Sequence, residues 1–286
     1  MTSFDKGLRH LIDEALKEDV GDGDHSTLSC IPPEAKGTAV LKIKEDGILA
    51  GIEVARKIFE YRENGSVFTA FKKDGDLISS GEQAFEVKSS IHTILQCERL
   101  VLNCMQRMSG IATLTKAYTD KLKGYKTKLL DTRKTTPNFR ILEKEAVKIG
   151  GGVNHRFGLF DMIMLKDNHI DFCGGIEKAI QQASSYVRTK RPELKIEIET
   201  RDIDDVKKVI ASGKGKVFRI MLDNFKPGQV TEALKLINGE YETEASGGIN
   251  LDNIQEYAAT GVDYVSAGAL IHQARSLDMS LKALIV

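Results

Sequence analysis

The chain has 286 residues, enough to bury a sizeable core in one large or two small domains. Its 41 Lys and Arg residues balance 41 Asp and Glu residues, which argues against a nucleic-acid or membrane-surface protein with a basic excess. No stretch approaches about 18 consecutive apolar residues, and the acidic start of the chain lacks the apolar core of a signal peptide. The cysteines form no CxxC pair and no zinc spacing, so we expect reduced thiols in a cytoplasmic protein at Cys30, Cys97, Cys104 and Cys173.

The first third of the chain predicts an α+β domain. Helices are expected at 4–19 and 52–62, where apolar residues recur at helical spacing. Short strands separated by Asp-Gly and Ser-Gly turns are expected at 38–43, 48–50, 67–72 and 84–88. The Asp-Gly cluster around Asp22 and Asp24 fits no Ca²⁺-binding loop, so an irregular polar loop is favoured there.

Residues 92–123 have a helical pattern. An apolar stripe runs from Ile94 to Met105, and Ser109-Gly110 predicts an interruption before a second helix at 112–122. Arg99 lies early in this segment, and its local pattern alone fits an exposed helix face.

After residue 124 strands and helices alternate. Strands are expected at 127–131, 162–166, 195–199, 217–222, 241–246 and 262–266, and helices near 138–149, 175–188, 203–211, 228–237 and 251–259. This alternation predicts right-handed βαβ units and a parallel sheet, either open or closed into a barrel. Polar residues follow several different strands at their carboxyl ends, which favours a barrel, because an open sheet would concentrate its site at one switch point.

The stretch from Asp131 to His169 gathers cations at the ends of elements. Pro137 disfavours a helix at Thr136, so a loop is expected between the first strand and the next helix. The cationic residues and a histidine are Arg133, Lys134, His155, Arg156 and Lys166. Their placement suits a pocket for a polyanion, and the alternative is ordinary surface charge.

Two carboxylates end neighbouring strands of the predicted sheet. Alternation places Glu197 with Glu199 on one face, and Arg219 with Asp223 on one face of the next strand. Glu199 and Asp223 therefore point to one cavity, where they could stabilise a cation-forming sugar and bind Mg²⁺ through substrate and water. A structural ion-pair network is the alternative. Below them we expect a buried ionic layer in which Arg219 contacts Glu197 or Glu244.

Small residues follow the last two strands. Ser246-Gly247-Gly248 and Ala267-Gly268-Ala269 let backbone N–H groups approach a phosphate. Barrels often bind phosphate after their last two strands, so these turns predict a phosphate site.

These motifs resemble the quinolinate phosphoribosyltransferase family, whose members are also called decarboxylating nicotinate-nucleotide pyrophosphorylases. The similar segments span nearly the whole chain in the expected order: EDVGDGDHST, ERLVLNCMQRMSGIATLT, DTRKTTPNFR, GGGVNHRFGL, LKDNHI, EIET, LDNF, EASGGI and GVDYVSAGAL. A small departure is Asn138, where the family pattern leads us to expect glycine.

The resemblance implies an α/β protein in which an α/β barrel of fewer than eight strands, at 111–271, follows an N-terminal α+β sandwich-like domain. That domain would comprise 1–110 and be completed by 272–286. The implied activity transfers phosphoribose from phosphoribosyl pyrophosphate to quinolinate and yields nicotinate mononucleotide, pyrophosphate and CO₂ for NAD biosynthesis, with Mg²⁺ required.

The resemblance also implies roles residue by residue. Arg133, His155, Arg156 and Lys166 match positions that hold the dicarboxylate, and Lys134 and Lys166 match positions near pyrophosphate. Glu199 and Asp223 match ribose and metal-water positions, so the implied catalytic set is Lys134, Lys166, Glu199 and Asp223. Thr132 joins the substrate-binding set, and Ser246, Gly247, Gly248 and Gly268 match the 5′-phosphate turns. Arg99 matches an arginine lent by the neighbouring subunit of a homodimer.

Two other interpretations stay open. A related pyrophosphorylase-like enzyme could use a different heteroaromatic acid, although a pair of arginines suits two carboxylates. A non-catalytic sensor could bind a phosphorylated ligand, but it would not need both Glu199 and Asp223 beside the lysines.

Overall fold

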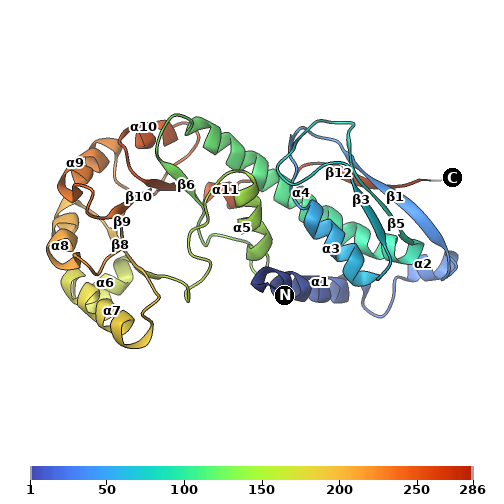
Figure 1. The fold of residues 1–286 in the computed structure, drawn as a ribbon, viewed down its shortest axis with the longest axis horizontal. Coiled ribbons are helices and arrows are strands. Elements are labelled where there is room, and N and C mark those ends of the chain that lie inside the picture. Colours follow the sequence, from blue (N-terminus) through green and yellow to red (C-terminus); the bar gives the residue numbers. More distant parts are fainter. Residues whose placement is uncertain (1, 285–286) are drawn as a thin grey trace. The chain divides into compact units, whose positions relative to one another are not determined.

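The fold is described by a computed structural model, which covers residues 2–284 (Figure 1). The chain divides into two compact units. Residues 1–116, 135–151 and 270–286 form the first, called here the sheet unit, and residues 117–134 and 152–269 form the second, called the barrel unit. The boundary expected at residues 110 and 111 falls inside helix α4 (Ile91–Lys121). No helix among residues 2–284 is both long and apolar enough to cross a membrane.

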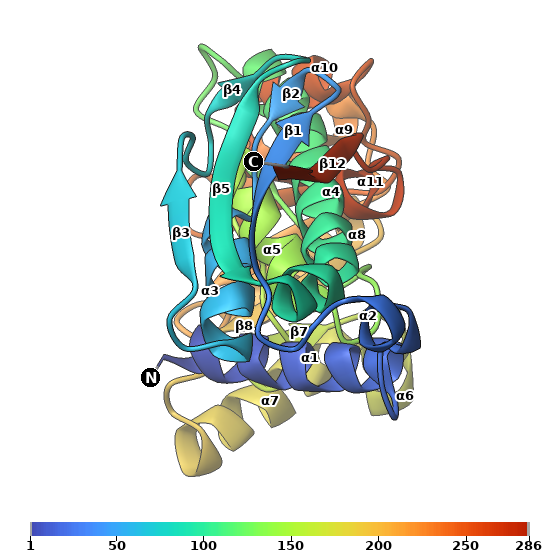
Figure 2. The same ribbon diagram turned by 90° about the vertical axis from the view of Figure 1, so that its right-hand side faces the viewer.

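The sheet unit is built on four antiparallel strands in the order β12-β1-β5-β3, which lie side by side in Figure 2. Their bounds are Lys36–Ile43 for β1, Val67–Ala70 for β3, Gln83–Ser90 for β5 and Met279–Leu284 for β12. A small second sheet pairs β2 (Gly47–Ile48) with β4 (Leu77–Ile78). The final strand β12 pairs with β1 from Thr38↔Leu284 to Ile43↔Met279, so the end of the chain supplies an edge of the first sheet.

Helices α1 (Ser3–Val20), α2 (His25–Cys30), α3 (Ile52–Arg62) and α5 (Arg140–Ile149) also belong to the sheet unit. The polar loop expected at 18–27 is in part helix, because the side chain of Asp24 accepts a hydrogen bond from Thr27 N at 3.1 Å and caps α2. This aspartate is thus a helix cap. The short helix α11 (Ala269–His272) crosses from one unit to the other.

Helix α4 runs without a break through Ser109-Gly110, so the expected interruption is wrong. Ser109 Oγ bonds both the N–H and the carbonyl of Ala50, at 2.9 and 3.1 Å. A Cβ on Gly110 would collide with the backbone of Arg275 and Ser276. Serine and glycine are therefore required here by close packing of other segments against the helix.

The barrel unit contains six parallel strands in the order β6-β11-β10-β9-β8-β7. Their bounds are Lys128–Leu130 for β6, Ile163–Leu165 for β7, Ile196–Thr200 for β8, Arg219–Asp223 for β9, Glu242–Ser246 for β10 and Tyr264–Ser266 for β11. Helices α6 (Asp167–Cys173), α7 (Ile176–Lys190), α8 (Ile203–Gly213), α9 (Pro227–Ile237) and α10 (Ile254–Ala259) follow in turn. Figure 1 shows α7 to α10 as an outer arc around the strands. Since β6 and β7 remain the two edges of this sheet in the described chain, the barrel is incomplete, as expected.

The strand register stacks acidic and basic side chains in layers. Glu197 and Glu242 both lie opposite Arg219, and Glu199 and Glu244 both lie opposite Met221, one layer nearer the carboxyl ends. Ile196 and Ile198 alternate with the two glutamates of β8 and are fully or almost fully buried. The predicted alternation is therefore correct, and it carries charged side chains into the barrel.

Candidate active site

The loop after β6 is fixed by a buried carboxylate. Asp131 is fully buried, and its Oδ1 accepts a hydrogen bond from His155 N at 2.7 Å. Val153 aligns the same two segments, since its N–H donates to Leu129 O at 2.8 Å and its carbonyl accepts from Asp131 N at 3.1 Å. The chain that carries His155 thus lies alongside the end of β6.

Thr132, Arg133 and Lys134 follow directly at this strand end. Thr132 Oγ1 accepts a hydrogen bond from Lys134 N at 3.0 Å, which tightens the turn between them. Lys134 is exposed, whereas Thr132 and Arg133 are half-buried. The three predicted ligand-binding residues therefore follow a backbone position that the bond of Asp131 to His155 fixes, and Lys134 is the exposed one.

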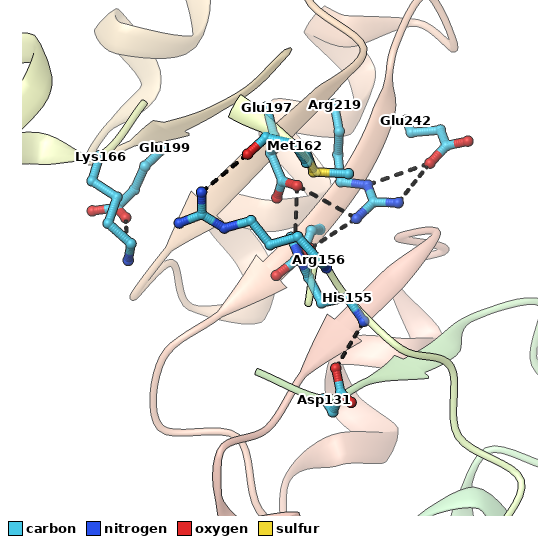
Figure 3. Close-up of polar contacts among 10 residues, drawn as sticks. Asp131, His155, Arg156, Met162, Lys166, Glu197, Glu199, Arg219 and Glu242 are labelled. Carbon is cyan, nitrogen blue, oxygen red and sulfur yellow. Dashed lines mark hydrogen bonds and ion pairs between the residues drawn. The ribbon is translucent and has the colours of Figure 1, made fainter. Parts of the chain in front are cut away.

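Arg133 and Arg156 both belong to the barrel unit, and the charge of Arg133 acts on Arg156. Arg156 is 8 % exposed, and its Nη1 donates to Met162 O at 3.1 Å (Figure 3). Burial and the charge of Arg133 lower the pKa of Arg156, while Glu197 and Asp161 act in the opposite direction. Two neighbouring cations with limited solvation create a favourable place for a dianion.

Lys166 and Glu199 meet across the ends of β7 and β8. Lys166 Nζ lies 3.5 Å from Glu199 Oε2, and Lys166 N donates to His169 Nδ1 at 3.0 Å in the first turn of α6. Burial raises the pKa of Glu199, and the charge of Asp223 raises it further, while Lys166 opposes the shift. The structure therefore brings together a lysine and the two carboxylates that the strand pattern predicted.

A buried ionic layer lies next to Glu199, with Glu197 and Arg219 one level below it and Glu244 at its own level. Arg219 Nη1 is 3.5 Å from Glu197 Oε2 (Figure 3) and 3.2 Å from Glu244 Oε2, which confirms the predicted contacts. His155 also joins this layer, with Nε2 3.0 Å from Glu197 Oε2 and 3.2 Å from Glu244 Oε2. Its Nδ1 accepts a hydrogen bond from Arg156 N at 2.7 Å. Contact between His155 and a dicarboxylate stays a prediction.

The layer needs one proton beyond its fixed charges. Two ionised glutamates and Arg219 leave a net charge of about −1 in a buried space. Burial and the charge of Glu244 raise the pKa of Glu197 to about 7. Burial would lower the pKa of His155, but Glu197 and Glu244 outweigh it and raise that pKa. Because Nδ1 of His155 already accepts from Arg156 N, we place the shared proton on the side of Nε2 and the carboxylates.

The turn after β10 depends on two glycines with left-handed backbone, and its binding of a phosphate stays a prediction. Gly247 and Gly248 have positive φ angles of 94° and 65°. A Cβ on Gly247 would collide with Asn224, whose N–H donates to Ser246 O at 2.7 Å. Gly268 follows β11, where Ala267 N donates to Leu130 O at 3.1 Å.

Asn224 lies between a predicted catalytic carboxylate and the glycine turn, and sequence reasoning did not single it out. Its φ is 58°, and its Nδ2 donates to Asp223 Oδ2 at 2.6 Å. It therefore joins a predicted catalytic carboxylate to the glycine turn. The available signal was an Asn directly after a strand-ending Asp, because asparagine tolerates left-handed backbone better than most residues.

Comparison with known proteins decides the family. Residues 24–109 match the N-terminal domain of quinolinate phosphoribosyl transferase, and residues 111–282 match its C-terminal domain. The chain belongs to the quinolinate phosphoribosyltransferase family. A Bacillus subtilis relative, a probable nicotinate-nucleotide pyrophosphorylase (carboxylating), is 41 % identical over 96 % of this chain and 92 % of its own length. The chloroplastic nicotinate-nucleotide pyrophosphorylase (carboxylating) of Oryza sativa is 43 % identical over 96 % of this chain and 77 % of that protein.

Solved structures agree with this family assignment. The crystal structure of NadC from Streptococcus pyogenes superimposes with a TM-score of 0.90 and 40 % identity, covering 100 % of this chain and 99 % of that one. The one departure noted in the family segments, Asn138, has a φ of 61°. This is left-handed backbone, which glycine adopts freely and asparagine tolerates better than most residues.

Arg99 stands apart from the other predicted residues of the family site. It is exposed on α4 in the sheet unit, whereas the remaining predicted site residues belong to the barrel unit. Its exposure agrees with a residue available to another subunit, and that role stays a prediction.

Proposed function

We propose that the chain converts quinolinate and phosphoribosyl pyrophosphate to nicotinate mononucleotide, pyrophosphate and CO₂, a step of NAD biosynthesis. The observation that carries this proposal is the grouping of the Arg133–Arg156 pair with Lys166, Glu199 and Asp223 in one unit. A dianionic heteroaromatic acid complements the cations, and a sugar that becomes cationic complements the carboxylates.

The cationic side chains of the site offset the repulsion between the two anionic substrates. Arg133 and Arg156 can each form a two-point contact with a carboxylate, with His155 and Lys166 completing the dicarboxylate pocket. Holding both reactants in one orientation supplies a large part of the rate acceleration in such two-substrate reactions. Arg156 is only 8 % exposed, so water weakens its attraction for the anionic substrate less than it would at the surface.

Transfer then proceeds through positive charge on the ribose. The bond from the anomeric carbon to pyrophosphate breaks, and its electron pair leaves with the pyrophosphate. Glu199 and Asp223 stabilise the resulting oxocarbenium-like carbon, and Lys134 and Lys166 stabilise the leaving group. The quinolinate nitrogen donates its lone pair to that carbon and becomes a pyridinium.

Decarboxylation follows from the same charge. The carboxylate beside the pyridinium nitrogen leaves as CO₂, and the electron pair stays on the ring carbon, where the adjacent positive nitrogen stabilises it. A proton from solvent completes nicotinate mononucleotide. No nucleophilic side chain is required by these steps.

The 5′-phosphate is proposed to bind the turns at Ser246, Gly247, Gly248 and Gly268. Positive φ angles at Gly247 and Gly248 turn the backbone in a way that most side chains would disfavour. Backbone N–H groups in such turns can point toward an anion.

Mg²⁺ is proposed as the cofactor, held mainly by pyrophosphate oxygens and water beside Glu199 and Asp223. This fits the donor set, since Mg²⁺ commonly binds through one or two carboxylates together with substrate phosphates. Among residues 2–284, the group of three potential metal ligands is His155, Glu197 and Glu244, and both of its carboxylates already pair with Arg219. When bound, the ion would neutralise charge that develops on the pyrophosphate.

The working assembly is proposed to be a homodimer in which Arg99 of one subunit completes the quinolinate pocket of the other. Such dimers could assemble into a larger oligomer. A side chain that is always charged and forms two parallel hydrogen bonds suits such an interface. A cytoplasmic location remains a prediction.

The test of function is a coupled set of product measurements. Purified protein is incubated with quinolinate, phosphoribosyl pyrophosphate and Mg²⁺, and quinolinate loss is followed together with nicotinate mononucleotide, pyrophosphate and CO₂. We expect the loss of quinolinate to equal the formation of each of the three products in molar amount. A parallel reaction with nicotinate in place of quinolinate should release no CO₂. Tight quinolinate binding without consumption would instead indicate a sensor, and turnover of another heteroaromatic acid alone would indicate a related enzyme.

A further inference from the structure

The two buried glutamates below the site have no part in the reaction steps described above. Glu197 and Glu244 are each 0 % exposed, and both carboxylates face the same two groups, His155 Nε2 and Arg219 Nη1. A buried ionic cluster of this kind is weak support for stability alone, because desolvation offsets much of the attraction. The cluster includes His155, which is bonded to the backbone of Arg156, and this link suggests a role in placing a predicted substrate-binding residue.

His155 connects this layer to the substrate-binding residues. Its Nε2 faces the glutamates, its Nδ1 accepts from Arg156 N at 2.7 Å, and its own N–H donates to Asp131 Oδ1 at 2.7 Å. Asp131 directly precedes the turn that carries Arg133 and Lys134. The orientation of the imidazole ring therefore bears on the backbone at Arg156 and is joined to the start of the loop after β6.

We propose that Glu197 and Glu244 are positioning residues, which fix the imidazole of His155 and through it set Arg156 for the carboxylates of the substrate. The inference rests on the proposed function. Loss of either glutamate should therefore weaken binding of the dicarboxylate more than it slows the chemical steps.

The strand β10 provides a matched control. Glu242 and Glu244 both bind Arg219, Glu242 through Arg219 Nε at 3.3 Å and Nη2 at 2.9 Å. The structure gives Glu244, and not Glu242, an ion pair with His155 within the described residues. The side chain of Glu242 is also 37 % exposed, against 1 % for Glu244. A role that consists only of neutralising Arg219 would affect the two positions alike, while positioning of His155 requires Glu244.

The experiment compares Glu244→Gln, Glu197→Gln and Glu242→Gln in the full chain with Mg²⁺ present. Thermal unfolding first establishes that each variant is folded, and calorimetry measures quinolinate binding beside steady-state kinetics. Glu197→Gln keeps the size of the side chain and resembles its protonated form, so it serves as a second test if Glu244→Gln does not fold. We expect the quinolinate KM and Kd to rise about tenfold or more in Glu244→Gln and Glu197→Gln. In the same variants kcat and the KM for phosphoribosyl pyrophosphate should change less than about threefold, and Glu242→Gln should match the wild type.

The outcomes separate this inference from the proposed function. A wild-type chain that neither binds nor consumes quinolinate would overturn the function, and the inference with it. Wild-type binding together with unchanged quinolinate affinity in the folded Glu244→Gln or Glu197→Gln variants would overturn the inference alone. Equal losses in Glu244→Gln and Glu242→Gln would do the same, because they would assign the effect to Arg219.

Discussion

Glu143 and Arg107 form an ion pair in which one carboxylate oxygen, Glu143 Oε1, accepts hydrogen bonds from both Arg107 Nε at 3.0 Å and Nη2 at 2.9 Å. The glutamate side chain is fully buried, and it also accepts from Thr136 N at 2.8 Å and Thr136 Oγ1 at 2.9 Å. Arg107 in turn donates to the carbonyls of Ile271 and Ala274, each at 2.7 Å. One carboxylate thus joins α4, α5 and the segment around α11 within the sheet unit.

Replacement of this carboxylate should destabilise the protein strongly. Glu143→Ala leaves Arg107 and the Thr136 N–H without their partner, a loss of about 3–5 kcal/mol for a buried pair. Glu145→Ala on the same helix removes a more exposed pair with Lys148 and should cost less than about 1 kcal/mol. Urea denaturation of both variants provides the comparison. Equal unfolding free energies for the two would show that the buried pair contributes little.

Glu199→Ala and Asp223→Ala should lower turnover more than they weaken quinolinate binding. Their proposed interaction is made with the cationic ribose of the transition state, so its loss appears in kcat, by about 10²–10³-fold. The control is Asp204→Ala, which removes an exposed carboxylate on α8 and should leave kcat unchanged. Steady-state kinetics with both substrates varied makes the distinction. A rise confined to the quinolinate KM, with kcat intact, would contradict the assignment.

The two glycines after β10 should differ in their tolerance of a side chain. Gly247→Ala combines a φ of 94° with a collision against Asn224, so we expect a loss of about 1–3 kcal/mol and a higher KM for phosphoribosyl pyrophosphate. Gly248→Ala has a φ of 65° and open space around the new Cβ, so about 1 kcal/mol is expected. Chemical denaturation of both variants tests the order. A more stable Gly247→Ala variant would refute the close approach.

Glu63 should contribute stability that depends on pH. Its Oε2 accepts from Ser90 Oγ at 2.6 Å and from Ser89 Oγ at 2.9 Å, and these hydrogen bonds, that of Ser90 first, lower its pKa to about 2 against the opposing effect of burial. The folded-state pKa is depressed, so the stabilisation is present above the unfolded value of about 4.3 and is lost as pH falls toward about 2.

Unfolding free energies of wild type and Glu63→Gln should therefore differ by about 1–3 kcal/mol at pH 7 and converge as the pH is lowered through that window. Glu60→Gln, an exposed position on the same helix, is the control and should follow the wild type throughout. A difference that stays constant down to pH 3 would assign the effect of Glu63→Gln to shape instead of charge.

Arg99 should act in trans. Arg99→Ala and Lys134→Ala are each expected to be nearly inactive, because each removes a cation from every site. Random mixing of the two subunits makes about half of the dimers mixed, and each mixed dimer regains one intact site, so about a quarter of wild-type activity should return. Subunit exchange is followed with differently tagged chains. Confirmed exchange without recovered activity would show that Arg99 does not act across the interface.

The sequence pattern predicted the barrel strands to within one or two residues, because buried parallel strands such as 196–200 alternate clearly and end in polar residues. It also predicted the contacts of Arg219, since a charged side chain pointing into a barrel needs a partner. The same reasoning could not place His155 against Glu197 and Glu244, because that contact joins residues far apart in the chain and belongs to no repeating element.

The sequence predictions were wrong where contacts with distant segments determine the backbone conformation of a residue. Ser109-Gly110 has the composition of a helix break, yet α4 is continuous because Ala50 and Arg275 need small neighbours there. Helix α6 was missed because seven residues between a strand and two glycines give too little periodicity to recognise. Local composition reports backbone preference, and packing against distant segments can override it.

The pairing of β12 with β1 has a consequence for the newly made chain. Until β12 has been made and has left the ribosome, β1 can pair with β5 on one side and presents unpaired N–H and C=O groups on the other. Such an open edge is a template for association with other chains. Synthesis of the whole barrel comes between β1 and β12, so the eight-residue edge of β1 stays uncovered for that time, until the six-residue strand β12 becomes the edge in its place.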